Sequence, residues 1–144
     1  MVMSKTVLVT GGSGFVGQRL KLQQPYWTYI SSEDCDLTSA EQVADLYATI
    51  KPDAVVHLAA RVGGIKDNIN NQADFYHLNT MMNTNVLHEA HKADIPRVLS
   101  SLSTCAYPED LNNFPFTEDD FFGGPPAQTN FSYGMTKRML HVAS

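Results

Sequence analysis

The sequence contains few of the features that mark membrane, secreted or nucleic-acid-binding proteins. No apolar run approaches the roughly 20 residues that a helix needs to span a bilayer. The net charge is −5 and there is no run of Lys or Arg, which argues against nucleic acid or an anionic membrane as a partner. The only two cysteines, Cys35 and Cys105, show no metal-ligand spacing with each other or with the five histidines, so we expect no metal site.

The size and the N-terminus of the chain predict one domain and no targeting segment. The 144 residues correspond to about one domain, and 43% hydrophobic residues is ordinary for a globular protein. The first residues, M-V-M-S-K, pass directly into an apolar run, so we expect no signal peptide. With only two cysteines, the simplest expectation is a reduced, cytoplasmic protein.

The most informative stretch is Thr6–Gly17, in which β-branched and apolar residues run into three glycines. The spacing G-x-x-G-x-x-G follows a predicted buried strand and opens a helix. In such a turn Gly11 takes backbone angles closed to other residues, Gly14 lets a pyrophosphate approach the main chain, and Gly17 lets the helix pack close to the strand. The helix start offers N–H groups and a positive dipole end to a phosphate. A plain structural turn is the alternative, but the flanking strands favour a dinucleotide site.

Apolar runs alternate with helical patterns along the rest of the chain. We expect strands over Thr6–Thr10, Trp27–Ser31, Ala54–Ala60 and Arg97–Ser103. We expect a first helix that begins at the end of the glycine stretch and continues over Gln18–Gln24. We expect further helices from a capping box at Thr38 and Glu41 to Ile50, over about Asp74–Ala93 and from Ser132 to the end, with a helix-free loop over Ala106–Asn130. This α/β alternation predicts a parallel sheet with right-handed crossovers. The fold class we expect is a partial, doubly wound Rossmann sheet with strands in order 3-2-1-4, forming one domain over residues 1–144.

Polar side chains end the fourth predicted strand and open the last predicted helix. Ser103 and Cys105 close the strand, and the Y-x-x-x-K spacing puts Tyr133 and Lys137 on one helical face, a turn apart. A tyrosine with its usual pKa of about 10 is a poor acid–base catalyst at neutral pH. A nearby ammonium group stabilises the tyrosinate and lowers that pKa, while the serine hydroxyl would hold the substrate oxygen. An exposed helix pair is the alternative for Y-x-x-x-K alone.

Six segments together resemble the extended short-chain dehydrogenase/reductases and, within them, the GDP-L-fucose synthase family. They are T-G-G-S-G-F-V-G, S-S-E-D-C-D-L-T, H-L-A-A-R-V-G-G-I, N-T-M-M-N-T-N-V-L-H-E-A, L-S-S-L-S-T-C-A-Y-P and N-F-S-Y-G-M-T-K-R. The resemblance implies an NADPH-dependent enzyme, a homodimer when intact. Its nucleotide-sugar substrate would be GDP-4-keto-6-deoxy-D-mannose, epimerised at C3 and C5 and then reduced at C4 to GDP-L-fucose.

The resemblance also implies roles for individual residues. It implies that Ser103, Tyr133 and Lys137 form the reductase triad and that Cys105 is one of two epimerisation acid–bases. The residues expected to bind NADP are Gly11, Gly12, Ser13, Gly14, Phe15, Val16, Gly17, Asp36, Leu37, Leu58, Ala59, Ala60, Tyr133 and Lys137. The structural alternatives are a small buried residue for Cys105 and an ordinary helix-entry residue for Asp36.

The residues at the end of the second predicted strand do not distinguish clearly between NADP and NAD. A 2′-phosphate is usually bound by Arg or Lys, but this segment offers Ser31, Ser32 and Glu33. We expect no acid directly at the strand tip, where it would hold an NAD ribose, and the serines could bond a phosphate. The NADP expectation therefore rests on the resemblance.

Two features depart from the family pattern. The helix after Gly17 is short, and the sequence stops at Ser144, within the helix that carries Tyr133. On the resemblance, further strands, the second epimerisation residue and the substrate domain lie beyond this point, so we expect the 144-residue chain to be inactive alone. The alternatives are another nucleotide-sugar epimerase or dehydratase, and a non-catalytic cofactor-binding or dimerising module.

Overall fold

The computed structural model describes residues 5–110 and 114–144, and these residues form two compact units. Of the described residues, unit 1 comprises 5–60, 81–101 and 144, and unit 2 comprises 61–80, 102–110 and 114–143. The N-terminal residues 1–4, for which we expected no signal peptide, lie outside the described residues, as do residues 111–113 of the long predicted loop.

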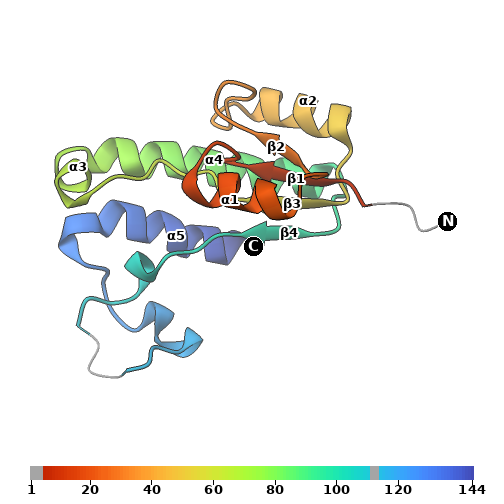
Figure 1. Ribbon diagram of the computed structural model, residues 1–144. Coiled ribbons are helices and arrows are strands. Elements are labelled where there is room, and N and C mark those ends of the chain that lie inside the picture. The colour runs from red at the N-terminus through yellow and green to blue at the C-terminus, as the bar shows by residue number, and fades with distance from the viewer. Residues whose placement is uncertain (1–4, 111–113) are drawn as a thin grey trace. The chain divides into compact units, whose positions relative to one another are not determined.

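Unit 1 contains a four-stranded parallel sheet, which confirms the α/β, Rossmann-like fold class (Figure 1). The strands are β1 (Val7–Thr10), β2 (Thr28–Ile30), β3 (Ala54–His57) and β4 (Val98–Ser100), each within the predicted segment but shorter. In the register, Leu8 pairs with Thr28 on one side and with Val55 on the other, and Val55 pairs with Val98.

The strand order is β2-β1-β3-β4. Our expected order of 3-2-1-4 was wrong for the third strand, which lies between β1 and β4 and not outside β2. The third strand joins β1 on the side opposite β2. The crossover through helix α2 (Ala40–Ile50) therefore carries the chain past β1. Alternating strands and helices do not reveal which side of β1 a later strand takes. The apolar character of Ala54–His57 requires only an interior position, and β3 has one between β1 and β4.

The core of unit 1 lies on one face of this sheet. Leu8 and Val55 of the sheet pack with Val43 and Tyr47 of α2 and with Val86 of helix α4 (Gln72–Lys92). The Tyr47 hydroxyl also donates a buried hydrogen bond of 3.1 Å to the Val86 carbonyl. Helix α2 and residues 81–92 of α4 thus cover the same face, while α1 (Phe15–Gln23) lies in front of the strands in Figure 1.

Helix α2 begins one residue later than the capping box predicted. Its N-cap is Ser39, whose side chain accepts a hydrogen bond from the Gln42 N–H. Thr38 is held outside the helix because its N–H and hydroxyl both donate to the Asp36 carboxylate, at 2.9 and 2.7 Å. The predicted apolar face is nevertheless right, since Val43 and Tyr47 are buried.

Unit 2 consists of short helices and one longer one. It contains α3 (Ile65–Asn70), the first turns of α4 and the helix α5 (Phe131–Ala143). Three short 3₁₀ helices complete it: η1 (Thr104–Ala106), η2 (Glu118–Phe122) and η3 (Gln128–Asn130). The last two lie in the stretch where we expected no helix. In the part of the chain that the structure describes, we find no helix of the length and apolar character that a membrane crossing requires.

Candidate functional site

The glycine turn of unit 1 connects β1 to α1 through backbone contacts that need glycine. Gly11 has a φ of +72°, in the left-handed region, and a Cβ there would lie 2.8 Å from the Ala59 nitrogen. A Cβ on Gly17 would collide with the Gly11 carbonyl oxygen. These two glycines therefore allow the sharp turn and the close approach of helix to strand.

Gly14, between these two glycines in the turn, is less crowded than either of them. A Cβ there would meet only the Gly11 carbonyl oxygen, at 3.2 Å. Gly14 is the N-cap of α1 and provides no side-chain cap, and Phe15, the first helical residue, is 93% exposed. The first N–H groups of α1 are thus open to an anion, as a pyrophosphate site requires.

The predicted adenine contacts, Asp36 and Leu37, follow β2 in unit 1. The Asp36 carboxylate accepts both Thr38 hydrogen bonds, which hold the pKa of that carboxyl below its usual value. This is the contact pattern of a helix-entry residue. Leu37 is buried in the core of unit 1, so only its main chain is available to a ligand there. Its carbonyl already accepts a 3.0 Å hydrogen bond from Asn85.

An acid does lie at the tip of β2, contrary to our expectation. The Asp34 carboxylate accepts hydrogen bonds from the N–H and the hydroxyl of Ser31, both at 2.8 Å. Ser31 is the residue directly after β2, and its hydroxyl is therefore engaged with a carboxylate. We missed this acid because the sequence separates it from the strand by three residues, and the turn brings it back.

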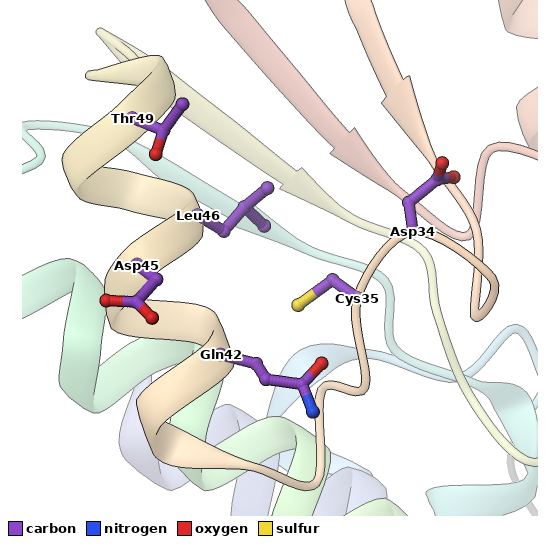
Figure 2. Close-up of a pocket in the computed structure, with 6 residues that line it drawn as sticks. All are labelled: Asp34, Cys35, Gln42, Asp45, Leu46 and Thr49. Carbon is purple, nitrogen blue, oxygen red and sulfur yellow. The ribbon is translucent and has the colours of Figure 1, made fainter.

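A cavity of about 280 Å³ lies between α2 and the segment after β2 (Figure 2). Its lining residues are Asp34, Cys35, Gln42, Asp45, Leu46 and Thr49. Figure 2 shows the Cys35 sulfur directed toward α2. Burial and the nearby carboxylates of Asp36 and Asp34 raise the pKa of this thiol, so it stays protonated at neutral pH. With Asp34 and Asp45 in its wall, the cavity disfavours a phosphate.

In unit 2, two of the four predicted catalytic residues, Ser103 and Cys105, lie near a third, Tyr133. Burial raises the pKa of Tyr133, the charge of an ionised Cys105 raises it further, and the nearby Ser103 hydroxyl lowers it. The Ser103 hydroxyl also accepts a 3.2 Å hydrogen bond from the Cys105 N–H. Tyr133 is therefore a protonated hydroxyl at neutral pH, held beside a serine and a cysteine.

Lys137, the fourth predicted catalytic residue, lies under the Tyr133 ring. Its Nζ atom is 5.7 Å from the ring centroid, and only 3% of the residue is exposed. Burial lowers the pKa of Lys137 to about 8. The ammonium group is thus placed close to the tyrosine, as the Y-x-x-x-K spacing predicted.

Two residues that we did not single out bring this group together. A Cβ on Gly134 would lie 2.5 Å from the Cys105 carbonyl oxygen and 2.9 Å from Pro126 Cβ, so only glycine lets α5 pack this closely on η1. The Arg138 guanidinium donates hydrogen bonds of 2.7 Å to the carbonyls of Ala106 and Gly124. The only sequence signal for either was its place within Y-G-M-T-K-R.

The V-G-G loop of the resemblance lies in unit 2 and is held by a buried asparagine. The Asn79 side chain accepts a hydrogen bond from the Arg61 N–H at 2.9 Å and donates to the Arg61 carbonyl at 3.0 Å. The Arg61 guanidinium forms an ion pair with Asp67 and lies 4.8 Å from the centre of the Phe75 ring. Phe75 in turn meets Tyr133 edge to face, with ring centroids 6.5 Å apart.

The chain is similar in sequence to curated proteins that are named as GDP-L-fucose synthases. A "Probable GDP-L-fucose synthase" of Drosophila melanogaster is 43% identical over 145 aligned residues, and a "GDP-L-fucose synthase" of Dictyostelium discoideum is 39% identical. Each alignment covers 96% of this chain and 45% of the relative, so the chain spans about half the length of these proteins.

Solved structures give the same result for the fold. A GDP-L-fucose synthetase from Naegleria fowleri bound to NADP matches with a TM-score of 0.85 at 30% identity, over 99% of this chain and 44% of that one. The family model described as "NAD dependent epimerase/dehydratase family" matches residues 7–143, nearly the whole chain. This confirms the predicted family resemblance, and the chain belongs to the NAD dependent epimerase/dehydratase family.

Proposed function

We propose that residues 1–144 are the N-terminal, NADP-binding Rossmann domain of a GDP-L-fucose synthase. The observation that carries the proposal is the grouping of Ser103, Cys105 and Tyr133 in unit 2. The proposed reaction epimerises GDP-4-keto-6-deoxy-D-mannose at C3 and C5 and reduces it at C4 to GDP-L-fucose. The names of the Drosophila and Dictyostelium relatives and the NADP bound by the Naegleria enzyme support it.

In the reduction, NADPH when bound supplies the hydride, and this chain's residues handle the oxygen. Tyr133 donates its proton to the C4 oxygen, and the Ser103 hydroxyl, which lies near enough to lower the pKa of Tyr133, holds that oxygen. The Lys137 ammonium stabilises the tyrosinate that remains. Because burial opposes ionisation of Tyr133, this nearby positive charge is what makes the proton transfer feasible.

In the epimerisation, Cys105 acts as one acid–base. As a thiolate it removes a proton from the sugar carbon next to the ketone and becomes the thiol. The charge of an ionised Cys105 raises the pKa of Tyr133, so Tyr133 keeps its proton while Cys105 is ionised. That proton is the one that the reduction uses.

The proposed cofactor site in unit 1 is built on the glycine turn. The N–H groups at the start of α1 would hold the pyrophosphate, with Gly12, Ser13, Phe15 and Val16 around it. Leu58, Ala59 and Ala60 follow β3 beside Gly11 and would line the site. Asp36 and the main chain of Leu37 would contact the adenine. Asp34 and Ser31, which are hydrogen-bonded to each other at the tip of β2, would determine whether the site prefers NADP or NAD.

Another nucleotide-sugar enzyme of the same family is the second candidate. A "GDP-L-colitose synthase" of Yersinia pseudotuberculosis is 33% identical over 91% of this chain, so a related GDP-sugar is chemically close. A need for Cys105 in exchange at both C3 and C5 would favour the fucose enzyme. The third candidate, a non-catalytic cofactor-binding module, predicts NADPH binding with no turnover even in a completed chain.

Assembly and location form the remaining part of the proposal. We propose a homodimer in the intact enzyme, with exposed apolar residues of α5, Met139 and Val142, at the interface. We also propose a cytoplasmic location, because both cysteines are free thiols and Cys105 must stay reduced to act as an acid–base.

The test uses a chain completed with the C-terminal part of the Drosophila relative. The completed chain should oxidise NADPH in the presence of the keto-sugar, and Tyr133→Phe should lower that rate by about 10²–10⁴-fold, the usual contribution of a positioned acid–base. Cys105→Ser should instead abolish deuterium incorporation from solvent at C3 and C5. An active Tyr133→Phe enzyme, or normal exchange with Cys105→Ser, would refute these assignments.

A further inference from the structure

Three buried polar side chains in unit 1 connect the ends of two strands to a helix. Thr10 and His57 are the last residues of β1 and β3 and pair in the sheet register. The Thr10 hydroxyl lies 2.8 Å from His57 Nδ1, and His57 Nε2 lies 3.1 Å from the Asn83 amide oxygen on α4. All three residues are 5% exposed or less. The imidazole therefore bridges the sheet and the helix without touching solvent.

In a neutral imidazole, the chemistry of these partners determines which nitrogen carries the proton. The Asn83 amide oxygen can only accept, so His57 Nε2 carries the proton and donates it. Nδ1 is then the bare nitrogen, and the Thr10 hydroxyl donates to it. The same hydroxyl oxygen accepts a 3.3 Å hydrogen bond from the Ala59 N–H. The result is one directed chain from the Ala59 amide through Thr10 and His57 to Asn83.

The Ala59 end of this series of hydrogen bonds lies next to Gly11, the first glycine of the dinucleotide turn. The Leu58 N–H donates to the Thr10 carbonyl at 3.3 Å, so the Leu58–Ala59 segment is held by both the main chain and the side chain of Thr10. That segment packs directly on Gly11, where a Cβ would come within 2.8 Å of the Ala59 nitrogen. A shift of the Ala59 peptide would therefore change the space in which Gly11 holds its left-handed conformation.

We propose that His57 is a positioning residue that sets the place of Gly11, and with it the pyrophosphate turn, through Thr10 and Ala59. At 1% exposed it contacts no ligand itself. The inference rests on the proposed dinucleotide function of the glycine turn. It predicts that cofactor affinity depends on the Thr10 hydroxyl, although that hydroxyl is buried and binds no cofactor.

The experiment compares Thr10→Val, which keeps the shape and removes the hydroxyl, with Thr10→Ser, which keeps the hydroxyl. The matched control is Thr80→Val, because the buried Thr80 hydroxyl has no hydrogen-bond partner among the described residues. In the 144-residue chain, Thr10→Val should weaken NADPH binding by about tenfold and speed hydrogen exchange of the Ala59 amide. Thr10→Ser and Thr80→Val should bind NADPH as the unsubstituted chain does.

Equal NADPH affinity of Thr10→Val and the unsubstituted chain would overturn the proposal, and so would a Thr10→Ser variant as weak as Thr10→Val. If the unsubstituted chain bound no NADPH, the proposed function would fail, while Ala59 exchange would still test the link to Thr10. Should Thr10→Val not fold, nitrogen-15 NMR of the unsubstituted chain decides. A His57 proton on Nε2 alone supports the directed chain, and a proton on Nδ1 contradicts it.

Discussion

Lys137 carries a charge in a place where a charge is costly. The residue is 3% exposed, and burial lowers its pKa to about 8 from an ordinary value of 10.5. A buried ammonium destabilises a fold unless nearby groups compensate it. Perturbed groups of this kind gather at functional sites, where the chemistry requires the charge. The Lys137 Nζ atom lies 5.7 Å from the Tyr133 ring centroid, where its charge can stabilise a tyrosinate.

We predict that Lys137→Met changes how stability depends on pH. Between pH 8 and 10.5 the unfolded chain holds more protons on Lys137 than the folded chain does, so this group makes stability rise with pH. The shift corresponds to a change of up to about 3 kcal/mol across that window. Urea unfolding from pH 7 to 10 should show the unsubstituted chain gaining stability relative to Lys137→Met.

The control for this prediction is Lys66→Met. Lys66 is an exposed residue of α3. Its removal should leave the pH dependence nearly parallel to that of the unsubstituted chain. If Lys137→Met also ran parallel, Lys137 would not be the buried, titrating base described here.

The sequence predicted geometry within a single helix or turn better than contacts between residues that are distant in the sequence. Helical spacing alone put Lys137 beside Tyr133, and the positive φ of Gly11 follows from its place in the turn. Gly134 was missed because its role depends on Cys105, which is distant in the sequence. The Asp34–Ser31 contact was missed because a turn, and no periodic pattern, returns the carboxylate to the strand tip.

At the scale of elements, the packing of α5 on η1 depends on one missing methyl group. A Cβ on Gly134 would lie 2.5 Å from the Cys105 carbonyl oxygen, which belongs to backbone and cannot rotate away. We predict that Gly134→Ala lowers the free energy of unfolding by about 1–3 kcal/mol, as overpacking usually does. In the completed chain it should also lower the rate of NADPH oxidation, because it displaces Tyr133 from Ser103.

Gly64→Ala provides the matched control for Gly134→Ala. No atom lies within 4 Å of a Cβ built on Gly64, and that residue has an ordinary negative φ of −71°. Urea unfolding should show little change for this variant. Similar stability losses in both variants would show that helix–loop packing is not what Gly134 provides.

Elements with a strong apolar period were predicted well, and those made by polar contacts were not. Helix α2 has its predicted buried face, and α4 lies within about two residues of its expected ends. The short helix α3 was missed because its residues are largely polar and Asn68 holds its start through side-chain hydrogen bonds to Gly63 and Gly64. Such contacts leave no periodic signal in a sequence.

At the scale of the whole chain, the sheet presents an apolar edge. β4 is the outermost strand in the order β2-β1-β3-β4, and its central residue Leu99 is 65% exposed. An apolar, uncharged strand edge is a site at which other chains pair. We predict that the 144-residue chain self-associates and that Leu99→Lys reduces this association in sedimentation experiments.

The control for the edge is Leu22→Lys on α1, which replaces a helix side chain that is 73% exposed. It adds the same charge without blocking β4, so association should continue. A monodisperse monomer for the unsubstituted chain, with a steep unfolding transition, would show that the β4 edge does not recruit other chains.

The central claim is that the glycine turn of this chain holds a dinucleotide, and an NADPH fluorescence titration of Gly14→Val tests it most directly. A valine at Gly14 would place its side chain where the pyrophosphate is proposed to bind, and its Cβ would make a close contact of 3.2 Å with the Gly11 carbonyl oxygen. We expect β1 to fold in this variant. We predict that the unsubstituted chain and Thr80→Val bind NADPH, more tightly than NADH, and that Gly14→Val does not. Equal NADPH binding by Gly14→Val would contradict the site, and tighter binding of NADH would contradict the NADP assignment.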